Sequence, residues 1–369
     1  MTEAKVLRGK ILVYRFFEVG SEIDLNKVTL LMQQKQNTTR FRLDRPNKTS
    51  LVIADAPLII HLGTTEMNLQ GVKTPVELDI SLWHFGGMSL CFHIPIPPGT
   101  KWSELVQTAS WLDRDDEIEV LARSKARELQ NEIKETIAVL NDWPSFEDYV
   151  VYFIQEIEGL KTSAMDLFEC ADIPALLLAE PKEVLSEQVK KSIRDYATQY
   201  SKDDLSVIDW NSALVVEPSG SMDLPMVLEF ANSQLLEMRY YDDLLDEKLD
   251  QLYRSVAGRK PGVLSDIYSH HAQEAGQIYL EIAEVVENVQ NSLKVVGDFY
   301  LATVFRTATT RFRFNDWQKS IDEKLSNLAE VSNLLHSRVS ERRSHLLELI
   351  IIVLIMIEVV PFVAGLLRN

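Results

Sequence analysis

The first third of the chain carries short apolar runs with the alternation and the β-branched and aromatic content that are typical of strands. Between the first two runs, residues 24–32 fit a short helix with Asp24 as its N-cap. Residues 95–99 hold three prolines and a glycine and end the pattern, because proline removes a donor from the strand ladder. We therefore predict a small α+β domain over residues 1–113. Its expected strands cover residues 11–17, 39–43, 50–54, 58–62, 76–80 and 88–94.

The next region, residues 114–222, is predicted to be mixed and mostly helical. One amphipathic helix opens at Asp115 and stops where Trp143 meets Pro144. Residues 145–180 fit a strand or a helix, because their periodicity does not distinguish the two. A cleaner helix follows over residues 183–200, and residues 208–216 indicate a strand or a strand pair.

The most regular helical pattern begins at Asp223, a favourable N-cap with Pro225 in the first turn. Apolar residues then recur at alternating spacings of three and four up to Val256, which is the heptad signature of a coiled-coil seam. Asp242 is the acidic member of this seam. It must be ion-paired, protonated or solvated, because an unpaired buried charge costs about 3–5 kcal/mol. With the stripes that follow, the pattern predicts a coiled-coil-like helical hairpin body over residues 223–345.

The longest apolar run is the last one, residues 346–367. Its segment 349–367 contains one ionisable residue, Glu358, and a helix of that length, at about 1.5 Å per residue, matches a hydrocarbon layer about 30 Å thick. The run predicts a C-terminal transmembrane helix, a tail anchor, with a buried core helix as the alternative. An acidic residue near the middle of a bilayer indicates a partner or a functional site, so Glu358 is a candidate for an interhelical contact within an oligomer. The alternative is that Glu358 is protonated in the lipid or reaches the bilayer surface near Pro361.

Charge and cysteine usage narrow the class of protein. Of 369 residues, 55 are acidic and 38 are basic, and the net charge of −17 disfavours binding to nucleic acid. Two distant cysteines fit a reducing compartment. Arginines at positions 338, 342 and 343 precede the apolar run and favour a cytoplasmic side for the bulk of the chain. The expected location is a bacterial inner membrane, or a mitochondrial inner membrane with the bulk in the matrix if the source is eukaryotic.

Candidate chemistry is sparse. No phosphate-binding glycine loop, dinucleotide fingerprint, nucleophile elbow or zinc-helix motif is present, so we assign no catalytic residue, cofactor or metal ligand. Asp242 and Asp246 lie one helical turn apart and could share a divalent cation or an acid–base task. The plainer interpretation is an ion pair for Asp242 and a solvated face for its acidic neighbours. The pair His270 and His271 has no evident second group of ligands and fits a solvated loop or helix start.

The most basic short segment covers residues 305–314. Its simplest interpretation is a corner of a helical hairpin with solvated arginines. Alternatively, one of its arginines is the partner of Asp242, or the segment contacts anionic lipid headgroups. The residues concerned are Arg306, Arg311 and Arg313.

Two segments resemble a known family. Residues 230–246 contain the run Ala-Asn-Ser-Gln-Leu-Leu-Glu-Met-Arg-Tyr-Tyr-Asp, and residues 340–358 join a Glu-Arg pair to an apolar helix with an Ile-Glu pair. Both resemble the "required for meiotic nuclear division" family, also called the Sif/YagE-like family or domain of unknown function 155. The resemblance implies a membrane-bound, oligomeric protein, and some eukaryotic relatives support mitochondrial translation. It directs attention to Gln234, Glu237, Arg239, Tyr240, Tyr241, Asp242 and Glu358.

Together these patterns predict a membrane-anchored homo-oligomeric scaffold or adaptor. It would hold a protein partner, such as a translational complex, at the cytoplasmic face, without doing chemistry. A metal-dependent hydrolase or nuclease that uses Asp242 and Asp246 is the first alternative. An anionic-lipid-binding module that uses the basic segment is the second.

Overall fold

The computed structural model describes residues 3–32, 37–40, 56–141, 143–160, 162–257, 267–292 and 299–366, so the strand predicted at residues 50–54 lies outside the described residues. The chain divides into two compact units. Unit 1 comprises Met1–Tyr240 and Val289–Asn315, and unit 2 comprises Tyr241–Asn288 and Asp316–Asn369. Helix α7 (Asp223–Ala257) contributes to both units.

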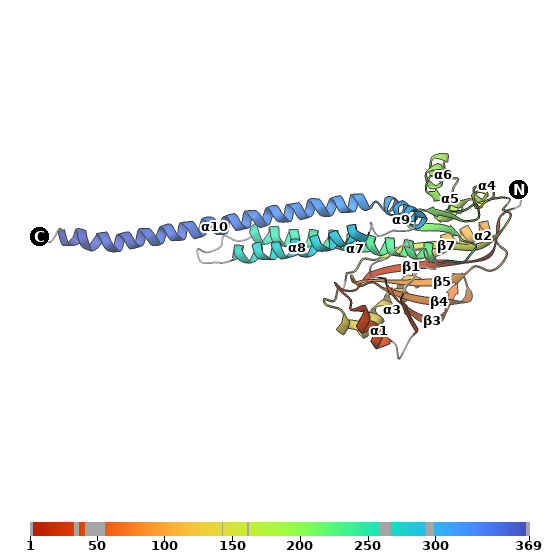
Figure 1. Ribbon diagram of the computed structural model, residues 1–369, viewed down its shortest axis with the longest axis horizontal. Coiled ribbons are helices and arrows are strands. Elements are labelled where there is room, and N and C mark those ends of the chain that lie inside the picture. The colour runs from red at the N-terminus through yellow and green to blue at the C-terminus, as the bar shows by residue number, and fades with distance from the viewer. Residues whose placement is uncertain are drawn as a thin grey trace. The chain divides into compact units, whose positions relative to one another are not determined.

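In unit 1, the described strands form one ten-stranded sheet (Figure 1). The strand order is β2-β3-β4-β5-β1-β7-β10-β9-β8, with β6 paired to β1. Neighbouring strands are antiparallel except β7 and β10, which are parallel. The strands are β1 (Lys5–Glu18), β2 (Asn37–Arg40), β3 (Leu58–Leu69), β4 (Val72–Leu82), β5 (Gly87–Pro95), β6 (Thr100–Lys101), β7 (Glu147–Glu158), β8 (Ala197–Thr198), β9 (Leu205–Ile208) and β10 (Ser212–Val216).

One face of this sheet carries the main hydrophobic core. Side chains such as Ile11 and Val13 of β1 and Phe92 of β5 pack there against helices. The helix α1 begins after Asp24, whose side chain accepts hydrogen bonds from the backbone of the first turn, as predicted. The helices that supply this core are α1 (Leu25–Met32), α2 (Trp102–Leu112), α3 (Glu117–Ile133), α4 (Leu167–Cys170), α5 (Ile173–Leu177) and α6 (Glu187–Arg194).

The opposite face of the sheet is covered by the first half of α7 and by α9 (Phe299–Arg311). Because side chains alternate along a strand, Tyr14 and Phe16 of β1 point to this second face, and they are as buried as their neighbours. Phe230 of α7 lies between Trp83, at a ring-centroid distance of 5.4 Å, and Phe305 of α9, at 5.6 Å. Burial on both faces explains why residues 11–17 of β1 form a nearly continuous apolar run.

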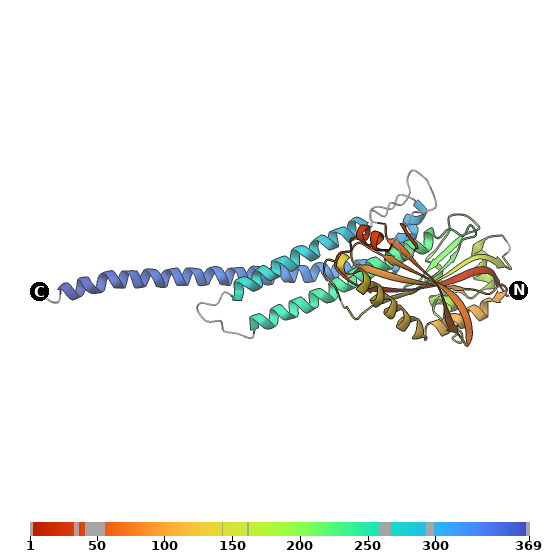
Figure 2. The ribbon, with the colours of Figure 1, turned by 90° about the horizontal axis from the view of Figure 1, so that it is seen from below.

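Unit 2 is helical. The second half of α7, helix α8 (Ile267–Ser292) and the first part of α10 (Phe314–Leu366) lie side by side (Figures 1 and 2). Ser332 of α10 donates to the carbonyl of Ala272 on α8 at 3.3 Å. The heptad stripe of α7 is buried from Leu228 to Leu252. Its members pack on the sheet in unit 1 and on helices in unit 2, where the buried apolar residues are Leu245, Leu249, Leu252, Ala272, Ala275, Ile282, Ile321, Leu325, Leu328 and Leu335.

The predicted arrangement, a small N-terminal α+β domain followed by a helical body, is wrong. The fold is a mixed α+β structure whose sheet continues through β7 to β10 and ends at Val216. The ambiguous segment after residue 145 supplies β7, which lies between β1 and β10 near the middle of the sheet. This segment is a strand because it pairs with strands that are distant in the sequence. Its local periodicity could not predict those pairings.

The predicted C-terminal transmembrane helix is also wrong. In the part of the chain that the structure describes, no helix is both long enough and apolar enough to cross a membrane. The apolar run is the far end of α10, a helix that starts at Phe314, and it contains both Glu348 and Glu358. An acidic side chain in the middle of a bilayer costs about 2.5–3.5 kcal/mol.

A glycine at the end of the β4–β5 hairpin offers a test of the fold. Gly86 has a φ of +112°, and a Cβ there would overlap the carbonyl oxygen of Gly20 and lie 2.6 Å from Glu18 Oε1. We expect Gly86→Ala to lower the free energy of unfolding by more than about 2 kcal/mol, because backbone strain and overlap add together.

The matched control is Gly63→Ala. Gly63 also has a positive φ, +85°, but nothing lies within 4 Å of an added Cβ, so the cost should be only about 1 kcal/mol. Urea unfolding of the two variants measures the difference, and equal losses of stability would contradict the described contact.

Candidate functional site

The surface of α7 that faces the sheet is polar as well as buried. Glu229, Asn232, Gln234 and Glu237 are each at most 6% exposed. Buried polar groups must find partners, since the loss of hydration is costly. Asn232 satisfies its amide within the helix, by donating to the carbonyl of Leu228 at 2.9 Å. The carboxyl groups of the two glutamates instead accept hydrogen bonds from side chains of the sheet or of α7 itself.

Glu229 points at the sheet, where its carboxyl accepts a hydrogen bond from Ser89 of β5. Burial raises the pKa of Glu229 to about 7, although hydrogen bonds from Ser89 and Ser81 oppose the shift. Burial likewise raises the pKa of Glu237 to about 8, and a hydrogen bond from Gln234 opposes it. Both groups therefore take up protons close to neutral pH, far from the ordinary range of a glutamate.

A third buried carboxyl lies at the end of β1. Burial raises the pKa of Glu18 well above its ordinary range, and the charge of Glu237 raises it further, while hydrogen bonds from Asn141 and the backbone of Gly20 act in the opposite direction. Glu18 Oε2 has no hydrogen-bond partner among the described residues. Glu18 and Glu237 are therefore a pair of like groups of which at least one holds a proton at neutral pH.

Arg239 and Tyr240 extend this polar cluster. The Arg239 guanidinium pairs with Glu147 of β7, which is itself buried. Burial raises the pKa of Glu147 to about 7, and the charge of Arg239 opposes that shift. The Tyr240 hydroxyl accepts a hydrogen bond from Asn141 Nδ2 at 2.8 Å, and its ring meets that of Trp143 edge to face.

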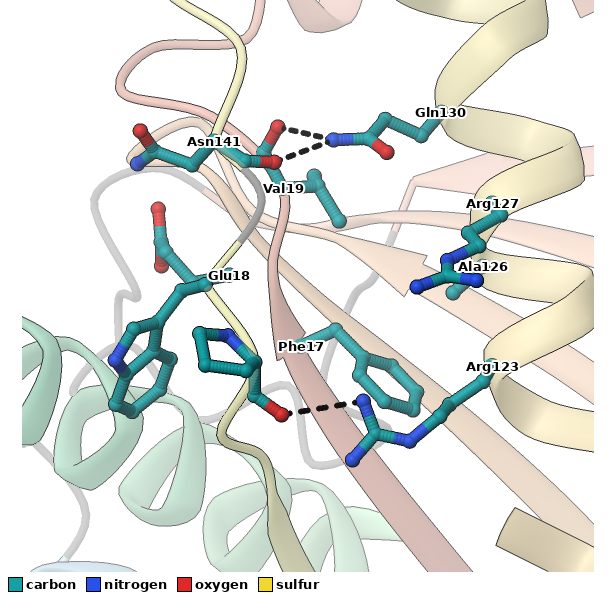
Figure 3. Close-up of a pocket in the computed structure, with 10 residues that line it drawn as sticks. Phe17, Glu18, Val19, Arg123, Ala126, Arg127, Gln130 and Asn141 are labelled. Carbon is teal, nitrogen blue, oxygen red and sulfur yellow. Dashed lines mark hydrogen bonds between the residues drawn. The ribbon is translucent and has the colours of Figure 1, made fainter. Parts of the chain in front are cut away.

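A cavity of about 180 Å³ opens beside Glu18 (Figure 3). Gln130 of α3 holds one wall together by donating to the carbonyls of Val19, at 2.8 Å, and Asn141, at 2.9 Å. On the other side, Arg123 donates to the carbonyl of Pro144 at 3.2 Å. The cavity is lined by Phe17, Glu18, Val19, Arg123, Ala126, Arg127, Gln130, Asn141, Trp143 and Pro144.

This cavity combines a buried carboxyl, an amide, aromatic rings and two guanidinium groups, so it can hold a small polar molecule. The described lining residues do not include a serine, cysteine or lysine nucleophile next to a base. The arrangement supports binding more directly than it supports catalysis.

The two aspartates proposed for metal binding are joined instead by a lysine. Lys324 Nζ of α10 lies 2.8 Å from Asp242 Oδ1 and 2.6 Å from Asp246 Oδ2. Ser320 also donates to Asp242 Oδ1, at 2.7 Å. Asp242 is thus ion-paired in the seam, as one interpretation required, but its partner is a lysine and not an arginine of the basic segment. An ammonium group occupies the position that a shared cation would need.

The basic segment forms a helix corner, in which α9 ends at Arg311 and α10 starts at Phe314. Arg311 is bound within unit 1. Its Nε donates to Asp209 Oδ1 at 2.7 Å, and its guanidinium lies 4.8 Å from the centre of the Tyr196 ring. Arg306 and Arg313 are exposed. The three arginines therefore do not act as one group.

Two further candidates belong to unit 2. Tyr241 is buried at the start of unit 2. Glu358 lies in α10, but its side chain is outside the described residues. Of the candidates from the second half of the chain, the structure brings together Gln234, Glu237, Arg239 and Tyr240.

Sequence reasoning missed the partners of these residues in the first half of the chain: Glu18, Asn141 and Glu147. Glu18 and Glu147 each directly follow aromatic residues in a strand pattern, at positions where a solvated acid is not expected. That signal could have marked both as buried acids. It could not have shown which helix they face.

The fold and this cluster define a mixed α+β protein with a buried acidic site and no recognisable catalytic group in its described residues. Residues 8–223 match the family model described as "Uncharacterized protein MJ0711, N-terminal domain". The chain belongs to this family. It is also similar to the uncharacterized protein MJ0711 of Methanocaldococcus jannaschii, with 23% identity over 184 residues, which cover 49% of this chain and 54% of the relative. The chain thus spans about half the length of that relative.

These matches overturn the resemblance to the "required for meiotic nuclear division" family. The family match covers residues 8–223, which hold most of the sheet and end at the first residue of α7, whereas the resemblance rested on residues 230–246 and 340–358. Apolar heptads that include Gln, Glu and Arg are common in long helices, so two such segments were a weak guide to ancestry.

The raised pKa values predict how stability depends on pH. Glu229 and Glu237 bind protons more tightly in the folded chain than in the unfolded chain. Their contribution to the free energy of unfolding is fully present below pH about 4.3 and is lost as the pH rises through about 7 to 8. Between pH 5.5 and 8.5 we therefore expect the free energy of unfolding to fall by more than about 1.4 kcal/mol, the worth of one pKa unit.

Urea unfolding at the two pH values measures this change. The control is the double variant Glu229→Gln, Glu237→Gln, which keeps the shape of both side chains and removes both titrations. Its stability should change less over the same interval. An equal change in the two proteins would mean that other groups are responsible.

The ion-pair network in unit 2 gives a second test. We expect Lys324→Met to lower the free energy of unfolding by about 3 kcal/mol, because Asp242 is left buried without its cation. Asp242→Leu should cost less than about 1 kcal/mol, since Lys324 keeps Asp246 and a leucine continues the apolar seam. Denaturant unfolding distinguishes the two, and the reverse order of stabilities would refute the assignment.

Proposed function

We propose that this protein is a non-enzymatic scaffold that self-associates through the far end of α10 and holds a protein partner there. A run of exposed apolar side chains carries the proposal. Within residues 346–359, which we call the apolar end of α10, the exposed fractions of the large apolar residues range from 38% to 64%. The exposed members are Leu346, Leu347, Leu349, Ile350, Ile351, Ile352, Val353, Leu354, Ile355, Met356, Ile357 and Val359.

Such a surface favours association. Each large aliphatic side chain gains about 1.5–3 kcal/mol when it moves from water to an apolar contact. Contiguous apolar patches of more than a few hundred Å² are rare on monomers and mark interaction sites. Figures 1 and 2 show α10 continuing past the ends of α7 and α8, so these helices do not cover its far end.

The residue pattern of the apolar end of α10 favours association with other copies of the same chain. No ionisable residue lies within 349–357, so no charge opposes the approach of two copies even though the whole chain carries a net charge of −17. In a parallel helical bundle, identical apolar faces are complementary by symmetry.

Self-association would leave a second surface for a partner. Successive helical residues are about 100° apart, so the uninterrupted apolar residues 349–357 surround the helix. A bundle of identical helices buries only the inward side of each one. The outward side stays apolar and suits an apolar helix or groove of another protein.

The alternatives receive less support from the described residues. A hydrolase that uses Asp242 and Asp246 would have to displace Lys324 from both carboxylates. A lipid-binding module that uses the basic segment would lack Arg311, which is bound to Asp209. The expectation of a translational partner came from the family resemblance and is withdrawn with it.

The oligomeric state tests the proposal. We expect the full-length protein to show a mass of at least two chains in light scattering after size exclusion. The triple variant Ile350→Lys, Val353→Lys, Ile357→Lys places charges along one face of the apolar end and should give a monomer. The control, Ser340→Lys with Ser344→Lys, adds charges at exposed polar positions of the same helix and should leave the mass unchanged.

A wild-type protein that stays monomeric up to about 100 µM would overturn the proposal. So would flotation of monomeric wild-type protein with phosphatidylcholine vesicles, because the apolar end would then be occupied by lipid and not by copies of the chain.

A further inference from the structure

Helix α8 carries two histidines and a glutamate within little more than one turn. One ring nitrogen of His270, one of His271 and a carboxylate oxygen of Glu274 all lie within 4.8 Å of one another. His271 Nδ1 is 3.4 Å from Glu274 Oε2, and His270 Nδ1 is 3.9 Å from the same oxygen. The sequence alone showed only the two histidines as a pair, and the helix adds the carboxylate.

The spacing suits a metal ion. Bonds of about 2.0–2.1 Å from zinc to nitrogen or oxygen place two ligands of a tetrahedral site about 3.3–3.4 Å apart. The pair His271 and Glu274 already has this separation. His270 needs only a small rotation, and its side chain is 79% exposed, so nothing packed around it prevents the movement.

A second feature separates this group from a surface ion pair. His345 and Glu348 on α10 have the same sequence spacing and the same distance, 3.4 Å, but lack a neighbouring histidine. At α8 the rings of two histidines approach the same carboxylate oxygen, whereas an ordinary ion pair brings only one ring to it. Two imidazoles and one carboxylate are a ligand set of open zinc sites.

We propose that His270, His271 and Glu274 bind a divalent transition-metal ion of the zinc class. The two nitrogen ligands disfavour Mg²⁺ and Ca²⁺, which prefer oxygen. Three protein ligands leave a fourth position open. All three belong to one helix of one chain, so the site binds one ion per chain whether or not the chain self-associates. The inference goes beyond the proposed scaffold function and does not depend on it.

Titration calorimetry of the full-length protein with ZnCl₂ alone tests the site. We expect one Zn²⁺ per chain, with MgCl₂ giving no heat of binding. His271→Ala and Glu274→Gln should each weaken zinc binding about tenfold or more. His270→Ala, at a largely exposed side chain that the fold does not need, should also weaken it. The matched control His345→Ala should bind zinc as tightly as the wild type.

Cobalt substitution supplies an independent readout. Co²⁺ bound by two imidazoles and a carboxylate absorbs visible light more strongly than the aqueous ion, and His271→Ala should remove this absorption while helical circular dichroism is unchanged. Absence of zinc binding up to about 100 µM would overturn the proposal. Full binding by the double variant His271→Ala, Glu274→Gln would also overturn it. A wild-type protein that binds zinc but forms no oligomers would contradict the scaffold proposal and would still support the proposed zinc site.

Discussion

Burial of carboxyl groups between α7 and the sheet is the constraint on which the rest of unit 1 depends. A helix that covers a sheet normally presents apolar residues, yet α7 presents Glu229 and Glu237 there. Each acid is compensated differently. Glu147 has Arg239 as its ion-pair partner, Glu229 accepts hydrogen bonds from hydroxyl groups, and at least one of Glu18 and Glu237 holds a proton at neutral pH. Loss of hydration costs too much for these groups to stay charged without such help, so the packing of α7 sets their protonation near neutral pH.

The same helix shows how one apolar stripe can serve two kinds of partner. In unit 1 the heptad residues of α7 pack on strands, and in unit 2 they pack on helices. Where the stripe contains Asp242, α10 supplies Lys324 and Ser320. A charged seam position that must be paired restricts which helix can lie opposite and in which register, whereas an apolar seam tolerates slippage.

The two parts of the chain differ in what supports a functional interpretation. The family match covers residues 8–223, which hold most of the sheet and end at the first residue of α7. Helices α8, α9 and α10 lie outside that match, and the scaffold proposal and the zinc site rest on this chain's own residues. The residues that line the cavity beside Glu18 all lie within the matched range. Its carboxyl, amide and guanidinium groups are suited to binding a small polar molecule. This property is separate from the two proposals for the helical unit.

Features that depend on near neighbours could be predicted from the sequence. Asp24 caps α1, short runs rich in apolar, β-branched and aromatic residues mark β1, β3, β4 and β5, and spacings of three and four mark α7, because each signal lies within a few residues of the chain. Only the tertiary structure decided that β7 pairs with β1 and β10, that Glu18 and Glu147 face α7, and that Lys324 is the partner of Asp242. These contacts join residues far apart in the chain, and periodicity specifies the face that a residue occupies but not what packs against that face.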